Sequence, residues 1–468
     1  MDLDAVLLAR IQFAFTVSFH IIFPSFTIGL AAFIATLLVR WRITGEDRFQ
    51  RLARFWTKIF AVSFAMGVVS GIVLSYQFGT NWAGFSKVTG NVLGPLIGYE
   101  VLTAFFLEAS FLGIMLFGWN RVSPNLHVLS AVLVAVGTSL SAFWIIAANS
   151  WMHTPAGHEI RDGIAYPVDW LAIIFNPSFP YRFSHMFTAA YLTTSIVVLA
   201  VGARYIVQNR FIEEAKTMVR MGLGMVAVLA PLQLVIGDMH GLNTKEYQPA
   251  KIAAIEGHWD GSKPADFIIF GWPNQEGTGN AVEVKFPFPG LASYILTHDF
   301  AGTFPGLNEF KPEDRPPVAP VFFAFRVMVG LGLLMIAMGF VGAFFWFRGT
   351  LFQSRTYFKL VQHAWPMGFI AILSGWWVTE SGRQPWLATG ILRTYDAVSP
   401  AITFNAVLTT LILFVVVYTA VFSMGTYYIN RLINKGPSGA AEEPPHGQPT
   451  RPLSAAEDAT REAIIGAR

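Results

Sequence analysis

Four side chains that could bind iron lie in or at the edge of long apolar stretches of this 468-residue chain. They are His20, His185, Met328 and Glu380. A His–Met pair is a ligand set for a low-spin haem, and a single His or carboxylate can leave one iron position open to a substrate. Plainer explanations exist, since His20 could hydrogen-bond between helices and Met328 could be packing. Iron chemistry requires these residues to meet at one depth of the fold.

Two further carboxylates, Glu100 and Glu108, share one apolar stretch. A carboxylate is costly to place in lipid, so both should face the protein interior, a cofactor or a proton path. At about 100° per residue, eight residues place them about 80° apart around a regular helix.

Two arginines lie within three residues of a candidate ligand. Arg326 precedes Met328 by two residues and could pair with a haem propionate or extend to the membrane surface. Arg383 follows Glu380 by three residues, which places an ion pair at a membrane edge.

The composition predicts the elements that must position these residues. The chain is 54% hydrophobic and 13% charged, against about 25% charged in soluble domains. It is therefore expected to be an all-α polytopic membrane protein. A net charge of +3 gives no support for a nucleic-acid partner, and the lack of cysteine excludes disulfides, Fe–S clusters and thiolate catalysis. Nine apolar spans are predicted, at residues 12–39, 56–78, 93–118, 127–150, 184–207, 219–238, 320–346, 358–379 and 400–429.

Basic residues set the expected orientation. Arg and Lys gather in the loops after spans one, five and seven, so the positive-inside rule predicts an outer N-terminus and a cytoplasmic C-terminus. His20 then lies roughly 12 Å below the outer end of its span, and His185, Met328 and Glu380 lie in the outer part of theirs. Glu108 is deeper than Glu100.

Four segments are expected along the chain. Residues 1–239 hold six spans, and 319–430 hold three more. Between them, 240–318 form a long outer loop whose aromatic content predicts an ordered cap. The Pro-rich segment 431–468 is expected to be a cytoplasmic, disordered tail.

Two redox classes do not fit the histidines. The chain has no adjacent His pair, as a haem–copper oxidase needs, and no span carries the two histidines of a bis-His diheme cytochrome b. From the residues alone, the expectation stops at a membrane protein with an outer-side redox or proton site. A transporter or channel that uses Glu100 and Glu108 as an ion path stays open.

Six motifs, in order, resemble subunit I of the cytochrome bd-type quinol oxidases, and the resemblance covers roughly residues 5–430. Met328 follows His185 by 143 positions, which indicates the short form of the outer loop, or Q-loop; this form is found in bd oxidases and in the cyanide-insensitive oxidases. The motifs are LARIQFAFTVSFHIIFPSFTIGLA (8–31), GYEVLTAFFLEASFLGIMLFGW (98–119), FSHMFTAAYLTT (183–194), QPAKIAAIEGHW (248–259), FAFRVMVG (323–330) and ESGRQPW (380–386).

The resemblance implies a set of haem contacts. His185 and Met328 would be the axial ligands of the low-spin haem b558. His20 and Glu380 would serve the high-spin haems b595 and d in an order left open, and a b-type haem can replace haem d. The implied propionate partners are Arg326 and Arg383.

The resemblance also implies proton and quinol sites. Glu100 would lie beside the oxygen-reducing haem and Glu108 on the proton route towards it. Gln248, Lys251 and Glu256 would line the quinol site in the Q-loop.

The implied activity is that of a quinol:O2 oxidoreductase in the bacterial inner membrane. Quinol would be oxidised at the outer face and O2 reduced to water with cytoplasmic protons, which generates membrane potential without pumping. Family members work with a second membrane subunit, and some with a small accessory one. A quinol-binding haem protein that does not reduce O2 is the remaining alternative.

Overall fold

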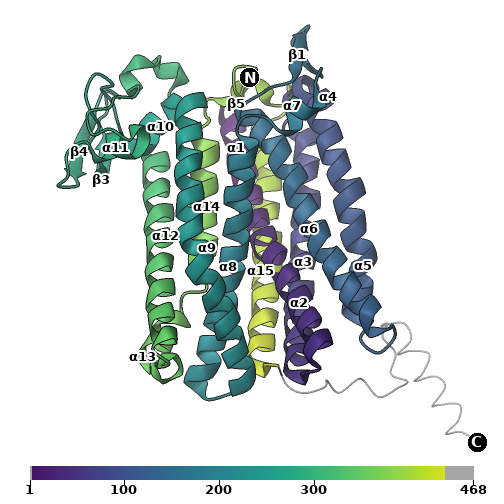
Figure 1. Cartoon of the computed structure of the whole chain (residues 1–468). Helices are drawn as coiled ribbons and strands as arrows, with labels where there is room; N and C mark the ends of the chain where they lie inside the picture. The colour runs from purple at the N-terminus through teal and green to yellow at the C-terminus, as the bar shows by residue number, and fades with distance from the viewer. Residues whose placement is uncertain (1–2, 438–468) are drawn as a thin grey trace, which may run out of the picture.

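Long helices form one bundle, and shorter elements form a cap at one end (Figure 1). The computed structural model describes residues 3–437. Within that part of the chain, eight helical segments are long and apolar enough to cross a membrane. They contain α1 and α2 (Leu3–Ile22, Pro24–Thr44), α3 (Asp47–Thr80), α4, η1 and α5 (Ala83–Glu100, Val101–Phe105, Phe106–Phe117), α6 (Pro124–His153), α8 (Phe179–Gln208), α9 (Ile212–Tyr247), α12 (Val318–Phe347) and α15 (Phe404–Lys435).

The predicted eighth span, 358–379, is divided in the structure. Its first residues belong to α13 (Arg355–Val361), and the rest form α14 (Met367–Ser381), which has only 15 residues. Pro366 accounts for the division, because the residue before a proline is disfavoured in helical geometry. A helix of 15 residues is shorter than the roughly 20 needed to cross a bilayer, so the count of nine spans stays a prediction, as does the orientation of the termini.

The predicted first span, 12–39, also contains a break. Pro24 has no backbone N–H to continue the helix, so α1 ends at Ile22 and α2 starts at Pro24. The break lies close to His20, which occupies the last turn of α1.

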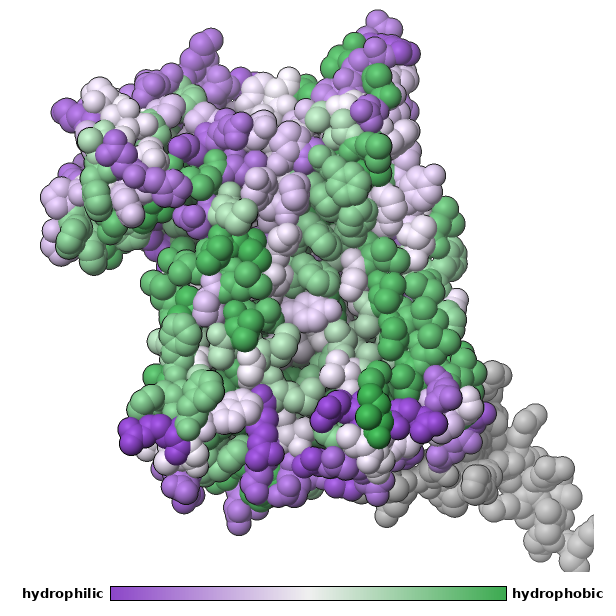
Figure 2. Space-filling model, viewed as in Figure 1, coloured by the Kyte–Doolittle hydropathy of each residue, from purple (hydrophilic) through white to green (hydrophobic). Residues whose placement is uncertain are grey.

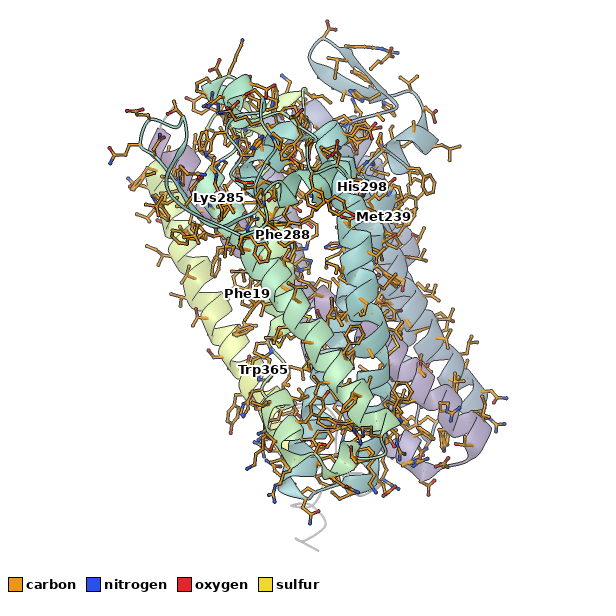
Figure 3. All side chains as sticks on the ribbon, turned by 60° about the vertical axis from the view of Figure 1, so that its left-hand side comes forward. Phe19, Met239, Lys285, Phe288, His298 and Trp365 are labelled. Carbon is orange, nitrogen blue, oxygen red and sulfur yellow. The ribbon has the colours of Figure 1, made fainter. Side chains whose placement is uncertain are left out.

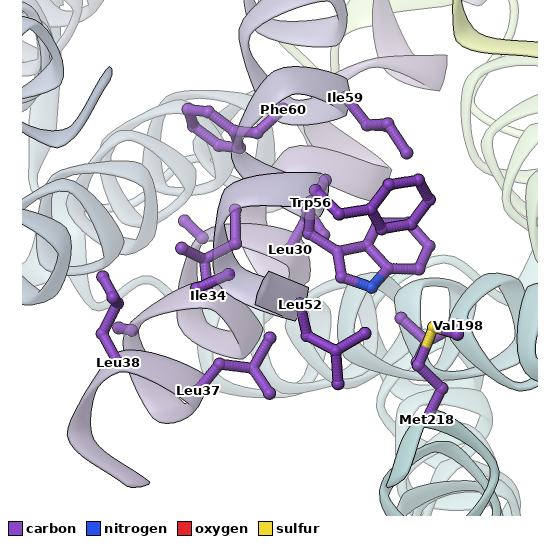
Figure 4. Packing of buried hydrophobic residues seen from close by; sticks show 14 of the residues in the cluster. Leu30, Ile34, Leu37, Leu38, Leu52, Trp56, Ile59, Phe60, Val198 and Met218 are labelled. Atoms are coloured by element: carbon purple, nitrogen blue, oxygen red, sulfur yellow. The ribbon is translucent and has the colours of Figure 1, made fainter. Parts of the chain in front are cut away.

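Four helices form a ring in which each contacts the next, namely α8, α9, α12 and α14. On its other side α8 packs against α2 and α6, and α2 packs against α3. The core there surrounds Trp56, with Leu30, Ile34 and Leu52 beside it (Figure 4). The hydropathy of the surface follows the same organisation, with an apolar band between two polar ends (Figure 2). The ring and its neighbours are therefore the frame that positions the candidate residues.

The cap is built mainly from the predicted outer loop 240–318. The first residues of that range continue α9 to Tyr247, and ordered elements follow. All three sheets of the described chain are antiparallel pairs. The elements of the cap are β1 (His158–Arg161), β2 (Ile164–Pro167), α7 (Trp170–Ile174), α10 (Pro249–Glu256), β3 (Ile268–Pro273), β4 (Asn280–Lys285), α11 (Leu291–Thr297), η2 (Leu307–Glu309), η3 (Pro312–Asp314), β5 (Trp386–Ala388), β6 (Leu392–Arg393) and η5 (Tyr395–Ala397). At the opposite end, η4 (Leu351–Gln353) precedes α13.

The predicted tail, 431–468, begins inside a helix. Residues 431–435 are the last of α15. Residues 438–468 lie outside the described part of the chain.

Candidate functional site

His185 and Met328 lie on two helices of the four-helix ring, α8 and α12. Gln233 of α9 approaches the His185 ring, with its Nε2 3.2 Å from Nδ1. His240, also on α9, has its ring centre 5.6 Å from that of His185. A ligating histidine carries its proton on the nitrogen that does not bind the metal, so Nδ1 must donate here. Gln233 Oε1 has no hydrogen-bond partner in the described chain and accepts from Nδ1 when the amide group is turned by 180°, which leaves Nε2 to bind a metal.

Glycines on the other two helices of the ring leave room for these side chains. A Cβ at Gly237 of α9 would lie 3.2 Å from His185 Cε1. A Cβ at Gly375 of α14 would lie 2.9 Å from Met328 Sδ. An alanine at either glycine would therefore narrow the space that His185 or Met328 occupies. Both His and Met are residue types that bind haem iron.

His20 repeats the arrangement between α1 and α3. Its Nδ1 lies 3.0 Å from Ser70 Oγ, and a Cβ at Gly71 would lie 3.1 Å from its Cε1. A polar partner again holds Nδ1 and a glycine again borders the ring. His20 therefore fits a histidine that offers Nε2 to iron.

Glu380 lies in the last turn of α14, within a buried polar cluster. Asn149 of α6 donates a hydrogen bond of 3.0 Å to Glu380 Oε1, and Arg383 forms an ion pair with Oε2. Arg182 of α8 donates in turn to Asn149. Asn149 and Arg182 were not among the residues predicted from the sequence. An arginine at the start of a span was the signal available for Arg182.

The guanidinium groups of this cluster can accept a further anionic partner. Nε and Nη1 of Arg383 and Nε of Arg182 are buried without a hydrogen-bond acceptor in the described chain. A buried donor without a partner costs about 1–3 kcal/mol, and a carboxylate would remove that cost. The propionates of a haem are such carboxylates, so the predicted partnership of Arg383 fits the geometry.

Arg326 is engaged differently from Arg383. Its Nε donates to Ile268 O at 3.0 Å and its Nη1 to Ile255 O at 2.9 Å. Its Nη2 lies 3.2 Å from Glu256 Oε2. All three nitrogens therefore hold the outer loop, and the propionate role of Arg326 stays a prediction that this network does not favour.

The predicted quinol residues lie on α10, the helix that follows α9. Pro249 at its first position and Gly257 after its end, with φ +63°, define this short helix. Lys251 and Glu256 are both buried, at 5% and 6% exposure. They face different partners, because Glu256 meets Arg326 of α12 while Lys251 points towards α6.

His153, at the end of α6, connects Lys251 with Glu380. Its Nδ1 lies 3.1 Å from Lys251 Nζ, and its Nε2 lies 3.4 Å from Glu380 Oε1. Gln248 donates to the His153 carbonyl at 3.1 Å and contacts Lys251 as well. His153 was not among the residues predicted from the sequence. Its contacts are with residues 95 to 227 positions away along the chain, and such contacts leave no pattern in the sequence.

Burial alters the acid–base behaviour of Lys251. Desolvation, together with the nearby guanidinium groups of Arg182 and Arg383, holds the pKa of Lys251 well below its usual range. Glu380 acts in the opposite direction but does not offset the effect. A lysine of this kind can be neutral and act as a base.

Glu100 and Glu108 lie on one side of their span, which corrects the predicted separation of 80°. Ser141 of α6 donates to Glu100 Oε1 at 2.7 Å, and a Cβ at Gly137 would lie 2.6 Å from Glu108 Cγ. Gly137 and Ser141 are one turn apart on α6. The π-helical turn η1, Val101–Phe105, lies between the two carboxylates and winds less per residue than an α-helix. Both therefore face α6.

Comparison with known proteins identifies the family of the chain. Residues 8–437 match the family model described as cytochrome bd terminal oxidase subunit I. The chain belongs to this family. The resemblance inferred from the six motifs is therefore confirmed, and membership makes the chain a multi-pass membrane protein of respiratory electron transport whose family binds haem.

Relatives match over almost their whole length. Cytochrome bd-II ubiquinol oxidase subunit 1 of Escherichia coli is 32% identical, covering 95% of this chain and 99% of the relative. Cytochrome bd ubiquinol oxidase subunit 1 of Bacillus subtilis is 33% identical, with coverage of 93% and 94%. The solved bd oxidase of Geobacillus thermodenitrificans has a chain with a TM-score of 0.84 and 28% identity, covering 92% of this chain and 99% of that one.

Proposed function

We propose that this chain is the haem-carrying subunit of a terminal quinol oxidase. Quinol is oxidised at the outer face, and O2 is reduced to water with protons drawn from the cytoplasm, so the reaction generates membrane potential without a pump. The observation that carries the proposal is the connection from Lys251 through His153 to Glu380. It joins a buried base in the outer loop to a candidate iron ligand. The relatives named as ubiquinol oxidases support the substrate class.

The proposed ligands would bind three haems. His185 and Met328 hold the low-spin haem b558. His20 and Glu380 serve haem b595 and haem d, or a b-type haem in place of haem d. When bound, the haems would carry single electrons, and one of the two high-spin haems would bind O2.

Quinol oxidation requires the removal of two protons near the membrane surface. Neutral Lys251 is the proposed base, since burial disfavours its charged form. Gln248 orients Lys251 through their hydrogen bond. Glu256, held in place by Arg326, is the second proposed proton acceptor, and the protons leave on the outer side.

Proton delivery to the oxygen site is assigned to Glu108 and Glu100. Both carboxylates face α6, where Ser141 holds Glu100. Glu108 is nearly fully buried, at 6% exposure, so a water-filled path or another protein group must connect it with the cytoplasm. The carboxylates are about 12 Å apart along the helix axis, at about 1.5 Å per residue. We propose that each carboxylate carries a proton over part of this distance.

The surroundings of the chain follow from the same proposal. The N-terminus lies outside and the C-terminus in the cytoplasm, as the basic loops indicate. The protein resides in a bacterial inner membrane and works with a second membrane subunit, and a small accessory subunit completes the complex in some family members. Nine crossings require α14, with 15 residues, to be counted as a span.

Quinol-driven oxygen consumption by the purified complex tests the proposal. Glu380→Ala is expected to abolish consumption, whereas Glu276→Ala, at an exposed position of the outer loop, is expected to retain it. Consumption at the unaltered rate in Glu380→Ala would contradict the assigned site. A reduced-minus-oxidised spectrum without haem bands would instead favour a transporter or channel, and haem bands without any oxygen consumption would favour a quinol-binding haem protein.

A further inference from the structure

The β3–β4 hairpin carries an apolar face that the proposed function does not use. Phe270 pairs with Val284, and Trp272 pairs with Val282. Because paired residues of adjacent strands share a face, these four side chains form one surface. All four are exposed: Phe270 by 42%, Val284 by 52%, Trp272 by 54% and Val282 by 56%. A contiguous apolar surface on a polar loop marks a contact with a partner or a membrane.

The opposite face of the hairpin packs against the protein in one part and carries charged side chains in the other. Gly271 points towards the ring of Phe322, which is buried. Beyond it, Lys285 lies 3.2 Å from Glu283 and 3.1 Å from Asp266. The hairpin is therefore amphipathic, and only the face with Phe270 and Trp272 lacks a polar surface.

The position of the hairpin identifies what meets the apolar face. The rings of Phe270 and Trp272 lie 5.4 Å and 5.9 Å from Phe323, in the second turn of α12. Phe323 shares one face of α12 with Val327 and Leu334, which are 45% and 54% exposed. The apolar face of the hairpin thus continues the exposed stripe of a membrane-crossing helix at its outer end.

The hairpin projects sideways from the bundle rather than above it. In Figure 1 β3 and β4 lie beyond α12, level with its outer turns. Figure 3 brings this side forward, with Lys285 and Phe288 labelled where the cap meets the outer end of the bundle. Phe288, just after β4, is 61% exposed. A segment placed in this way lies beside the outer turns of α12, where a membrane-crossing helix would meet the lipid surface.

We propose that the β3–β4 hairpin is a membrane-surface anchor, whose face of Phe270, Trp272, Val282 and Val284 lies in the interfacial layer of the outer leaflet. Aromatic side chains favour that layer. The anchor would fix the outer loop, because Arg326 hydrogen-bonds Ile268 O at the start of β3 and also holds Glu256. This inference concerns lipid contact and is independent of the proposed chemistry.

Neighbouring residues of β4 provide a matched test, because Val282 and Glu283 point to opposite faces. The chain has no cysteine, so Val282→Cys and Glu283→Cys each introduce a single labelling site into it. The complete complex is labelled with a small fluorophore and placed in phosphatidylcholine–phosphatidylglycerol vesicles. Quenching by a lipid-borne nitroxide is compared with quenching by aqueous iodide. Complex without an introduced cysteine gives the background from other subunits.

The label at position 282 is expected to be quenched several-fold more by the lipid nitroxide than the label at 283, with the reverse order for iodide. Equal quenching of both by iodide would show a hairpin in water and overturn the proposal. Protection of position 282 from both quenchers would assign the face to a partner subunit and overturn it as well. Unaltered haem spectra and oxygen consumption verify that either variant is intact.

Discussion

The substitution Gly375→Ala can show whether Met328 is an iron ligand or a packing side chain. A Cβ at position 375 would lie 2.9 Å from Met328 Sδ. Non-bonded heavy atoms normally approach to about 3.5–4.0 Å, so in Gly375→Ala the sulfur must move by about 0.6–1 Å. A packing methionine makes that movement at little cost, because its side chain is flexible. A methionine bound to iron cannot do so without loss of the bond.

The expected magnitude follows from the cost of overpacking, which is about 1–3 kcal/mol. At about 1.4 kcal/mol for each factor of ten, this disfavours the ligated arrangement by roughly 5- to 150-fold. We therefore expect Gly375→Ala to lose most of the low-spin b band in a reduced-minus-oxidised spectrum while total haem, measured as pyridine haemochrome, stays the same. A redox titration should show a lowered midpoint for any low-spin haem that remains.

Gly224→Ala is the matched control for this experiment. It makes the same substitution in a helix of the same ring, but among the described residues outside its own helix its Cβ would meet only Trp346, at 4.0 Å. Its spectrum should equal that of the unaltered protein. If Gly375→Ala also retained the full low-spin band and midpoint, Met328 would be a packing residue and the proposed ligand pair would be wrong.

Three further predictions concern ligation, quinol oxidation and proton delivery. Met328→Leu preserves volume but removes the sulfur, so the low-spin band should disappear with the fold intact, and a retained band would refute ligation. In Lys251→Arg, quinol oxidation should fall by more than tenfold at unchanged haem content, because arginine stays charged; the exposed Lys263→Arg should have no effect. Since the pKa of Lys251 is lowered, kcat/KM for quinol should rise with pH through that pKa in the unaltered protein, and a pH profile of Lys251→Arg that keeps this rise would exclude Lys251 as the base. Ser141→Ala removes the hydrogen bond to Glu100 and should slow oxygen consumption about tenfold, at a cost of ~1.5 kcal/mol, with haem reduction by quinol unaffected; equal rates would remove Ser141 from the proton route.

Local properties of the chain were enough to predict the class of the protein and its candidate ligands. Length and hydropathy are local properties, so the membrane-crossing helices could be placed from apolar runs, and the family followed from motifs such as ESGRQPW. A polar residue in lipid is costly wherever the chain folds, which is why Glu108 and His185 were recognisable without coordinates. The predicted eighth span overlooked a local signal, because Pro366 divides it.

The connections between these residues depend on how the helices pack and could not be predicted from the sequence. The π-helical turn η1 makes Glu100 and Glu108 point towards the same face of the neighbouring helix α6. A single wider turn rotates all later side chains of the span about the helix axis. The contacts of His153 with Lys251 and with Glu380 join three helices that are distant in sequence. Hydrophobic periodicity specifies which face of a helix is buried, but not which neighbour it meets. That choice depends on the packing of the whole bundle, and it assigned Arg326 to the outer loop and Arg383 to the polar cluster.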